Sequence, residues 1–218
     1  NIGFCKFVRN NYLDWVAPQQ RNRPLMSPDI FKTKVFPAID AGEKVFLIVI
    51  DNFRYDQWRV LSKEIGKLFD IDEYARNAIF SGLMPNQIAQ MFPELWVDED
   101  EEEGKNINEE PLIRTQIERY RRHDTFSYHK VNDSVGADRL LERFNTLRGN
   151  DLNVIVVNFI DMLSHARTES KMVRELANNE SAYRSITLSW FRHSVMAELI
   201  KALSQMDCKV IITTDHGS

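Results

Sequence analysis

The chain has 218 residues, of which 43% are hydrophobic and 28% are charged, a balance typical of a soluble globular protein. Its formal net charge is −4, and its longest charge run, residues 98–103, is acidic, which excludes the basic face expected of a duplex-DNA-binding protein. The only two cysteines, Cys5 and Cys208, do not suggest a disulfide framework, and no apolar run reaches the ~18 residues of a membrane span. We therefore expect a cytoplasmic protein without a membrane partner.

The first 42 residues are expected to form a helical segment. Residues 1–16 have the apolar spacing of an amphipathic helix, and no initiator Met or signal-peptide layout precedes them, so the chain reads as a piece of a longer protein. A polar connector follows. Ser27 and Pro28 then favour the start of a second helix, over residues 28–41, which should end at Gly42.

From residue 43 onward, apolar runs alternate with helical patterns. Residues 44–50, 152–159 and 208–214 are short runs rich in β-branched side chains, as in parallel strands buried on both faces, and residues 125–131 alternate as a further strand does. The pattern predicts helices over 54–69, 74–84, 85–90, 111–122, 136–147 and 180–206, and a solvated loop at the acidic run, which lacks the ligand spacing of an EF-hand. The predicted fold is therefore α/β, a doubly wound, mostly parallel sheet with helices on both faces.

An aspartate follows each of the three strongest strands. These are Asp51, Asp161 and Asp215, and two histidines, His165 and His216, stand close to them in the sequence. Ligands of such sheets bind outside the carboxyl ends of the strands, and carboxylate and imidazole groups together suit zinc, manganese or iron. Capping of the next helix would explain any single aspartate, but not the whole set. The sequence thus predicts a metal site at this edge, suited to hydrolysis of a phosphate ester or, by analogy, a sulfate.

The other histidines are expected to be structural. His123, His129 and His193 stand apart from the aspartates in the sequence, and a lone histidine is more often a satisfied surface or core residue than a ligand.

Four stretches, taken in order, resemble a PglZ domain, a branch of the alkaline phosphatase superfamily. They are VFLIVIDNFRYDQW (45–58), YARNAIFSGLMP (74–85), VNFIDMLSHAR (157–167) and IITTDHGS (211–218). The likeness is greatest to the output domain of PorX-type response regulators, which govern type IX secretion, and it covers residues 43–218. It implies a zinc-dependent phosphodiesterase or phosphatase, acting on a phosphoester and possibly on signalling oligonucleotides. It also implies an upstream receiver domain, a sensor kinase and possible homodimers.

The resemblance further implies two zinc ions. Asp51, Asp215 and His216 match the ligands of the metal that holds the nucleophile, and Asp161 and His165 match two ligands of the second metal. The family's nucleophile is a Thr just before the second stretch, where no Ser or Thr stands between Asp70 and Glu73. We therefore expect the native gene to encode a Thr-bearing stretch between Glu73 and Tyr74, and the superfamily's last histidine ligand to lie beyond residue 218. Ser81, inside the following helix, is expected to be structural.

Three other functions can be weighed against this one. A receiver domain with Asp51 as phosphoacceptor would need an acidic pair at its first strand and a Lys at its last, and neither is present. A non-catalytic metal-containing module that signals by binding partners would explain the missing nucleophile. A phosphomutase or sulfatase of the same superfamily would keep the ligands and differ in its substrate pocket.

Overall fold

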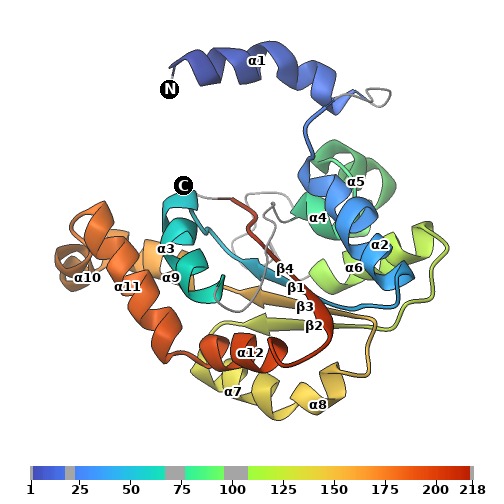
Figure 1. The fold of residues 1–218 in the computed structure, drawn as a ribbon. Helices are drawn as coiled ribbons and strands as arrows, with labels where there is room; N and C mark the ends of the chain where they lie inside the picture. The colour runs from blue at the N-terminus through green and yellow to red at the C-terminus, as the bar shows by residue number, and fades with distance from the viewer. Residues whose placement is uncertain (1, 18–22, 67–76, 96–107, 217–218) are drawn as a thin grey trace.

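The computed structural model describes residues 2–17, 23–66, 77–95 and 108–216, which form a parallel sheet with helices on both faces (Figure 1). The strands are β1 (Lys44–Ile50), β2 (Phe126–Val131), β3 (Leu152–Val157) and β4 (Cys208–Thr213), and their order across the sheet is β2-β3-β1-β4. All the pairings are parallel, so the carboxyl ends of the strands share one edge. The predicted fold class is confirmed.

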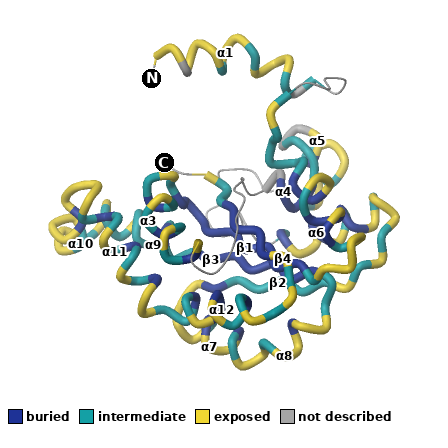
Figure 2. Tube along the Cα trace, viewed as in Figure 1, coloured by how far each residue is buried: buried dark blue, intermediate teal, exposed yellow. Residues whose placement is uncertain are grey.

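The central strand β1 owes its place to an unbroken apolar sequence. Its side chains alternate between the two faces of the sheet: Phe46, Ile48 and Ile50 belong to one core cluster, and Val45 and Leu47 belong to the other. Ile48 has no exposed surface, and full burial of such a side chain contributes about 1.5–3 kcal/mol. In Figure 2 the sheet forms the buried centre of the molecule, with the more exposed helices around it.

Two sets of helices cover these faces. One set packs on the face of Ile48: α3 (Tyr55–Ile65), α7 (Ser134–Glu142), α8 (Phe144–Leu147), α9 (Phe159–Glu169), α11 (Glu180–His193) and α12 (Val195–Leu203). The other set packs on the face of Leu47: the short helix η2 (Phe31–Val35), with α2 (Phe36–Asp40), α4 (Asn77–Ser81), α5 (Pro85–Met91) and α6 (Glu109–Arg119). The short turn η1 (Ser27–Asp29), which has no buried residue, leads into η2. Two short elements, η3 (Pro93–Leu95) and α10 (Lys171–Leu176), complete the described part of the chain.

Three sequence expectations about helices need correction. The expected helix 28–41 is divided into η1, η2 and α2, although the chain does turn at Gly42, where φ is +85°. The expected helix 180–206 is divided at Ser194, whose extended backbone (ψ 156°) separates α11 from α12. The expected helix 136–147 is likewise two helices, α7 and α8.

The third strand is also shorter than expected. β3 ends at Val157 rather than at residue 159, and Phe159 is already the first residue of α9, which the sequence did not predict. Asp161 therefore lies in the first turn of a helix and not at the tip of a strand.

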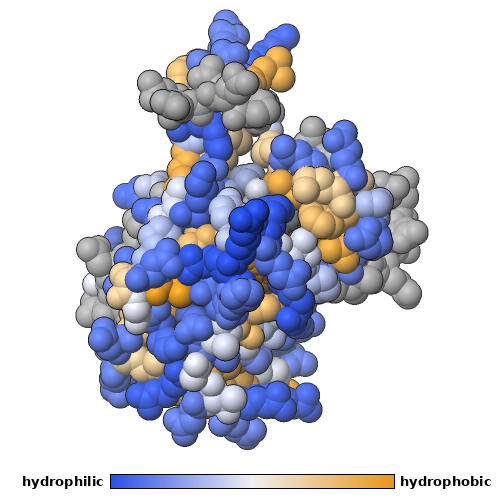
Figure 3. All heavy atoms as spheres, turned by 90° about the vertical axis from the view of Figure 1, so that its right-hand side faces the viewer, coloured by the Kyte–Doolittle hydropathy of each residue, from blue (hydrophilic) through white to orange (hydrophobic). Residues whose placement is uncertain are grey.

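The amino-terminal helix α1 (Ile2–Val16) stands away from the sheet in Figure 1. The face of the molecule shown in Figure 3 is mostly hydrophilic, with its hydrophobic side chains in separate patches. No helix among the described residues combines the length and the apolar character needed to cross a bilayer. Segment 30–40 shares a core with the sheet, and the predicted domain boundary at residue 42 stays a prediction.

Candidate metal centre at the carboxyl edge of the sheet

The turn after β1 places a buried carboxylate at the edge of the sheet. Asp51 is only 6% exposed, and its amide donates to Val157 O at 2.9 Å, which continues the ladder one residue beyond the strand. Asn52 then adopts a left-handed conformation with φ of +55°, a region that asparagine tolerates better than most residues. This reversal sends the chain away from the sheet toward α3, immediately after Asp51.

The segment after β4 is tied to this turn. Thr214 Oγ1 accepts a hydrogen bond from Phe53 N at 3.0 Å and donates to His216 O at 2.7 Å. Asp215 Oδ1 accepts from Asn52 N at 3.0 Å and from His216 N at 2.8 Å. The adjacent pair at the end of β4 is therefore held over the end of β1.

The third contribution comes from α9, which starts two residues after the end of β3. Asp161 accepts a hydrogen bond from Asn52 Nδ2 at 3.3 Å, so the turn after β1 contacts both neighbouring segments. His165 lies one helical turn further on, with its Nε2 3.4 Å from Asp161 Oδ2. Its side chain is 68% exposed.

Asp51, Asp161 and His216 form a group in which one ligand atom from each lies within 4.8 Å of the others. His216 Nε2 is 3.7 Å from Asp51 Oδ1. Ligand atoms around a tetrahedral zinc ion are about 3.4 Å apart, given zinc–ligand distances of about 2.0–2.2 Å. Small rotations of the side chains would bring these atoms to that spacing. Two carboxylate oxygens and one imidazole nitrogen also form a donor set that zinc accepts, so the residues present fit a metal ion.

The five predicted ligands lie at one edge of the sheet. Asp161 joins Asp51 and His216, while Asp215 and His165 lie next to this group, Asp215 Oδ2 being 3.6 Å from His216 Nε2. The assignment of these residues to two separate zinc ions stays a prediction.

The predicted nucleophile region, around Glu73 and Tyr74, lies outside the described residues, as does the acidic run 98–103. Ser81 is described and agrees with a structural role. It is 2% exposed, and its hydroxyl bonds to the backbone of Leu83.

Among the described residues, the group that could hold a metal ion consists of Asp51, Asp161 and His216, and it includes none of the three histidines expected to be structural. Nδ1 of His193 lies 2.7 Å from Ser189 O, one turn back in α11. His129 lies on β2, and burial lowers its pKa below the usual value.

Sequence reasoning missed two residues of this edge, Asn52 and Thr214. Neither is a strong metal ligand, so a search for carboxylates and histidines passes over them. Their backbone and side-chain contacts nevertheless join the ends of β1 and β4, and Asn52 also joins α9. An asparagine directly after a strand-ending aspartate was the available signal for a tight left-handed turn.

A cavity of about 260 Å³ opens at the carboxyl ends of β2 and β3, beside the first residue of α9. Phe159 and Trp190 stack along its wall with their ring centroids 4.2 Å apart. The rest of the lining is Val131, Asn132, Asp133, Ser134, Ala137, Val157, His193, Ser194, Val195 and Met196. The cavity lies beyond β3, on the side away from the candidate ligands of β1 and β4.

Comparison with known protein families gives one match. The family model described as the BREX system PglZ alkaline phosphatase-like domain matches residues 30–218, which is most of the chain. No curated protein matches the chain significantly. The matched segment contains β1 to β4 and every candidate ligand described above.

Proposed function

Because the chain belongs to the PglZ alkaline phosphatase-like family, we propose that it is a phosphoesterase-type module whose reaction centre is formed by Asp51, Asp161 and His216. The observation that carries this proposal is the convergence of these three residues at the carboxyl edge of the sheet. They are 110 and 55 residues apart in the sequence and come from segments that follow three different strands. The edge is also where ligands of such sheets bind.

Zinc is the metal that we propose for this centre. Asp51, Asp161 and His216 would hold it, and Asp215 and His165 are close enough to complete one site or to form a second. When bound, the ion would polarise a phosphoryl oxygen and favour the ionised form of a hydroxyl nucleophile. Asn52 would orient the ligands, since it contacts Asp215 through its backbone and Asp161 through its side chain.

The proposed reaction is hydrolysis of a phosphodiester, with signalling oligonucleotides as the substrate class. In the covalent route, a Thr hydroxyl attacks phosphorus, the bond from phosphorus to the leaving oxygen breaks, and the leaving alcohol takes up a proton. The phosphorus then remains joined to the Thr oxygen and to the substrate's other alcohol, and water cleaves the bond from phosphorus to the Thr oxygen, releasing a phosphomonoester and restoring the Thr hydroxyl. The place predicted for this Thr, next to Glu73 and Tyr74, is outside the described residues. The cavity beside Phe159 and Trp190 offers room for an apolar part of a substrate at the same edge.

The signalling context is a further part of the proposal. The resemblance of the sequence to PorX-type output domains supports a cytoplasmic response regulator in which a receiver domain precedes this module. In this proposal a sensor kinase phosphorylates the receiver domain, and the receiver domain promotes homodimers. Sequencing the gene upstream of Asn1 tests this directly. A receiver pattern, with its acidic pair and Lys, is the expected result, and any unrelated upstream domain contradicts it.

The test of the proposed function combines metal content with turnover. The zinc-loaded protein, expressed from the complete gene, should hydrolyse bis(p-nitrophenyl) phosphate, and Asp51→Asn and His216→Gln should each lower kcat at least ~100-fold through loss of metal. Asp138→Asn and His123→Gln make the same chemical changes at exposed residues outside both the candidate metal ligands and the cavity, and should leave turnover unchanged. Zinc binding without any turnover would favour the alternative, a non-catalytic module that signals through partners.

A further inference from the structure

Tyr183 of α11 lies between two arginine side chains that come from different parts of the candidate site. The Arg54 guanidinium carbon is 5.4 Å from the centre of the Tyr183 ring, and that of Arg167 is 5.0 Å from it. Arg54 directly precedes α3, three residues after Asp51, and Arg167 lies on α9, two residues after His165. Tyr183 itself is 3% exposed, and its hydroxyl donates to Ile160 O at 3.4 Å. Burial raises the pKa of this hydroxyl, which keeps it protonated as a donor.

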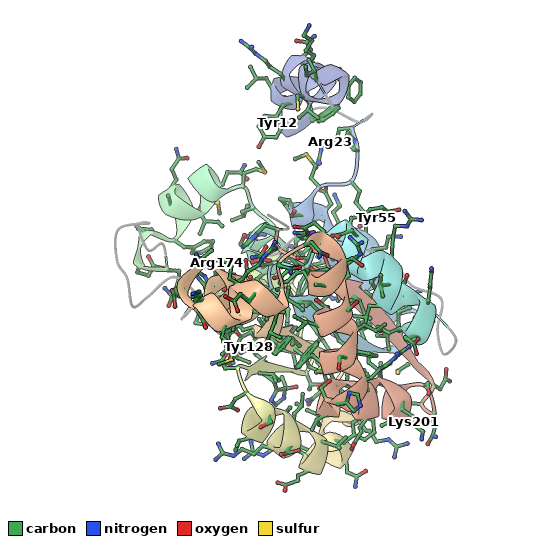
Figure 4. All side chains as sticks on the ribbon, turned by 90° about the vertical axis from the view of Figure 1, so that its left-hand side faces the viewer. Tyr12, Arg23, Tyr55, Tyr128, Arg174 and Lys201 are labelled. Carbon is green, nitrogen blue, oxygen red and sulfur yellow. The ribbon has the colours of Figure 1, made fainter. Side chains whose placement is uncertain are left out.

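Carboxylates hold both arginines in this arrangement. Arg54 bonds to Asp56 through two nitrogens, at 2.9 and 3.0 Å, and also to Glu180. Arg167 reaches the same Glu180 at 3.4 Å. The Arg54 guanidinium lowers the pKa of Asp56 to about 2, so this carboxylate stays ionised at neutral pH. The start of α3, the last turn of α9 and the first turn of α11 are thus joined through a single ring and its charged neighbours. Figure 4 shows the side of the molecule where these helices lie, with Tyr55 at the start of α3 and Arg174 on α10.

Helix α9 has few buried residues of its own, so its contacts with α11, including the Phe159–Trp190 stack, contribute to holding it in place. Ile160 is its only fully buried residue, and Met162 is 51% exposed. The Asn52–Asp161 bond joins α9 to the turn after β1, and at 3.3 Å it is long for a hydrogen bond. A segment with few buried apolar contacts opens locally at low free-energy cost unless other interactions hold it.

We propose that Tyr183 is a positioning residue: it anchors α9 to the segment that follows β1 and thereby keeps Asp161 beside Asp51 for metal binding. The part of the proposal that concerns metal binding by Asp161 rests on the proposed function. The anchoring of α9 does not, because it does not require a metal. The aromatic ring is the main element, because both guanidinium groups lie close to it, and the hydroxyl bond to Ile160 O is long, at 3.4 Å.

Three variants separate anchoring from general stabilisation. Tyr183→Leu removes the ring but keeps an apolar side chain, Tyr183→Phe keeps the ring and removes the hydroxyl, and Arg167→Gln removes one guanidinium without altering the buried ring. The matched control is Arg192→Gln. Arg192 pairs with Glu64 at 2.6 Å and so also joins α11 to α3, but through the other end of both helices and without contact to α9.

Two measurements read out the effect. Zinc affinity, from competition with a chromogenic chelator, should fall about 10–100-fold in Tyr183→Leu, the range found when residues that orient metal ligands are removed. It should fall less in Arg167→Gln and stay near the wild-type value in Tyr183→Phe and Arg192→Gln. Amide hydrogen exchange of residues 159–169 in the metal-free protein should be faster in Tyr183→Leu and Arg167→Gln than in Arg192→Gln.

The outcomes are distinguishable. Unchanged zinc affinity in both Tyr183→Leu and Arg167→Gln, or an equal loss in Arg192→Gln, would overturn the proposal. If the wild-type protein binds no zinc, the proposed function fails, and hydrogen exchange alone then decides: faster exchange of α9 in Tyr183→Leu supports the anchoring role, and exchange equal to that of the control overturns it. If Tyr183→Leu does not fold, Arg167→Gln supplies the same two readouts.

Discussion

The turn at Asn52 predicts an unusual order of stability among variants. At most positions glycine is less stable than alanine, by about 0.5–1 kcal/mol in regular structure, because it loses more backbone freedom on folding. Asn52 has φ of +55°, where an alanine pays about 1–2 kcal/mol of steric strain and a glycine pays none. Both variants lose the side-chain bond to Asp161, which contributes about 0.5–1 kcal/mol at its 3.3 Å length. Asn52→Ala should therefore be destabilised by about 1.5–3 kcal/mol, and Asn52→Gly by about 1 kcal/mol less.

The assay is equilibrium urea unfolding, with m-values compared so that stability changes are not confused with changes in the unfolded state. Lys201, exposed on α12, is the control position: there the Gly variant should be less stable than the Ala variant, by about 1 kcal/mol. The same order at position 52 as at position 201 would refute the reasoning, because it would mean that the turn does not hold residue 52 in the left-handed region.

Three further predictions concern the core and the titratable groups. Ile48→Ala, in the centre of the sheet, should lower the free energy of unfolding by about 2–5 kcal/mol in the same urea assay, and a loss under 1 kcal/mol would contradict its complete burial. Asp151 has its pKa lowered from 3.8 to about 2 by hydrogen bonds from Thr125 and Lys44, so its contribution to stability is present above pH 4 and is lost as the pH falls toward 2. Asp151→Asn should remove this part of the acid dependence in urea titrations between pH 2 and 5, and an unchanged dependence would argue against the pairing. Burial raises the pKa of Cys208 from 9 to about 11, which lowers the fraction of reactive thiolate at pH 8. Iodoacetamide should therefore alkylate Cys208 about 100-fold more slowly in the folded than in the urea-unfolded protein, as followed by peptide mass spectrometry. Equal alkylation rates would contradict the burial of this thiol.

The sheet was predictable because three of its strands are mostly apolar and the fourth, β2, alternates. The runs at residues 44–50, 152–157 and 208–213 leave little choice except strands buried on both faces, and an aspartate after each run marks the shared edge. The spatial order β2-β3-β1-β4 was not predictable, because β1, β3 and β4 are similarly apolar and carry no signal for their neighbours.

The sequence could name the candidate site residues, but it could not predict how they lie against one another. A short apolar run does not show whether a strand continues through Phe159 or a helix starts there. The position of Asp161 in the first turn of a helix therefore became visible only in the structure. The contacts of Asn52 with Asp215 and Asp161 span 163 and 109 residues, and those of Tyr183 join three helices. Such contacts depend on how the helices pack, which no local pattern in the sequence specifies.

The most direct test of the metal centre is a crystal structure of the zinc-loaded protein with anomalous data collected at the zinc edge. An anomalous peak should lie about 2.0–2.2 Å from a carboxylate oxygen of Asp51, a carboxylate oxygen of Asp161 and an imidazole nitrogen of His216. Zinc bound stoichiometrically elsewhere, with these three side chains unliganded, would contradict the account.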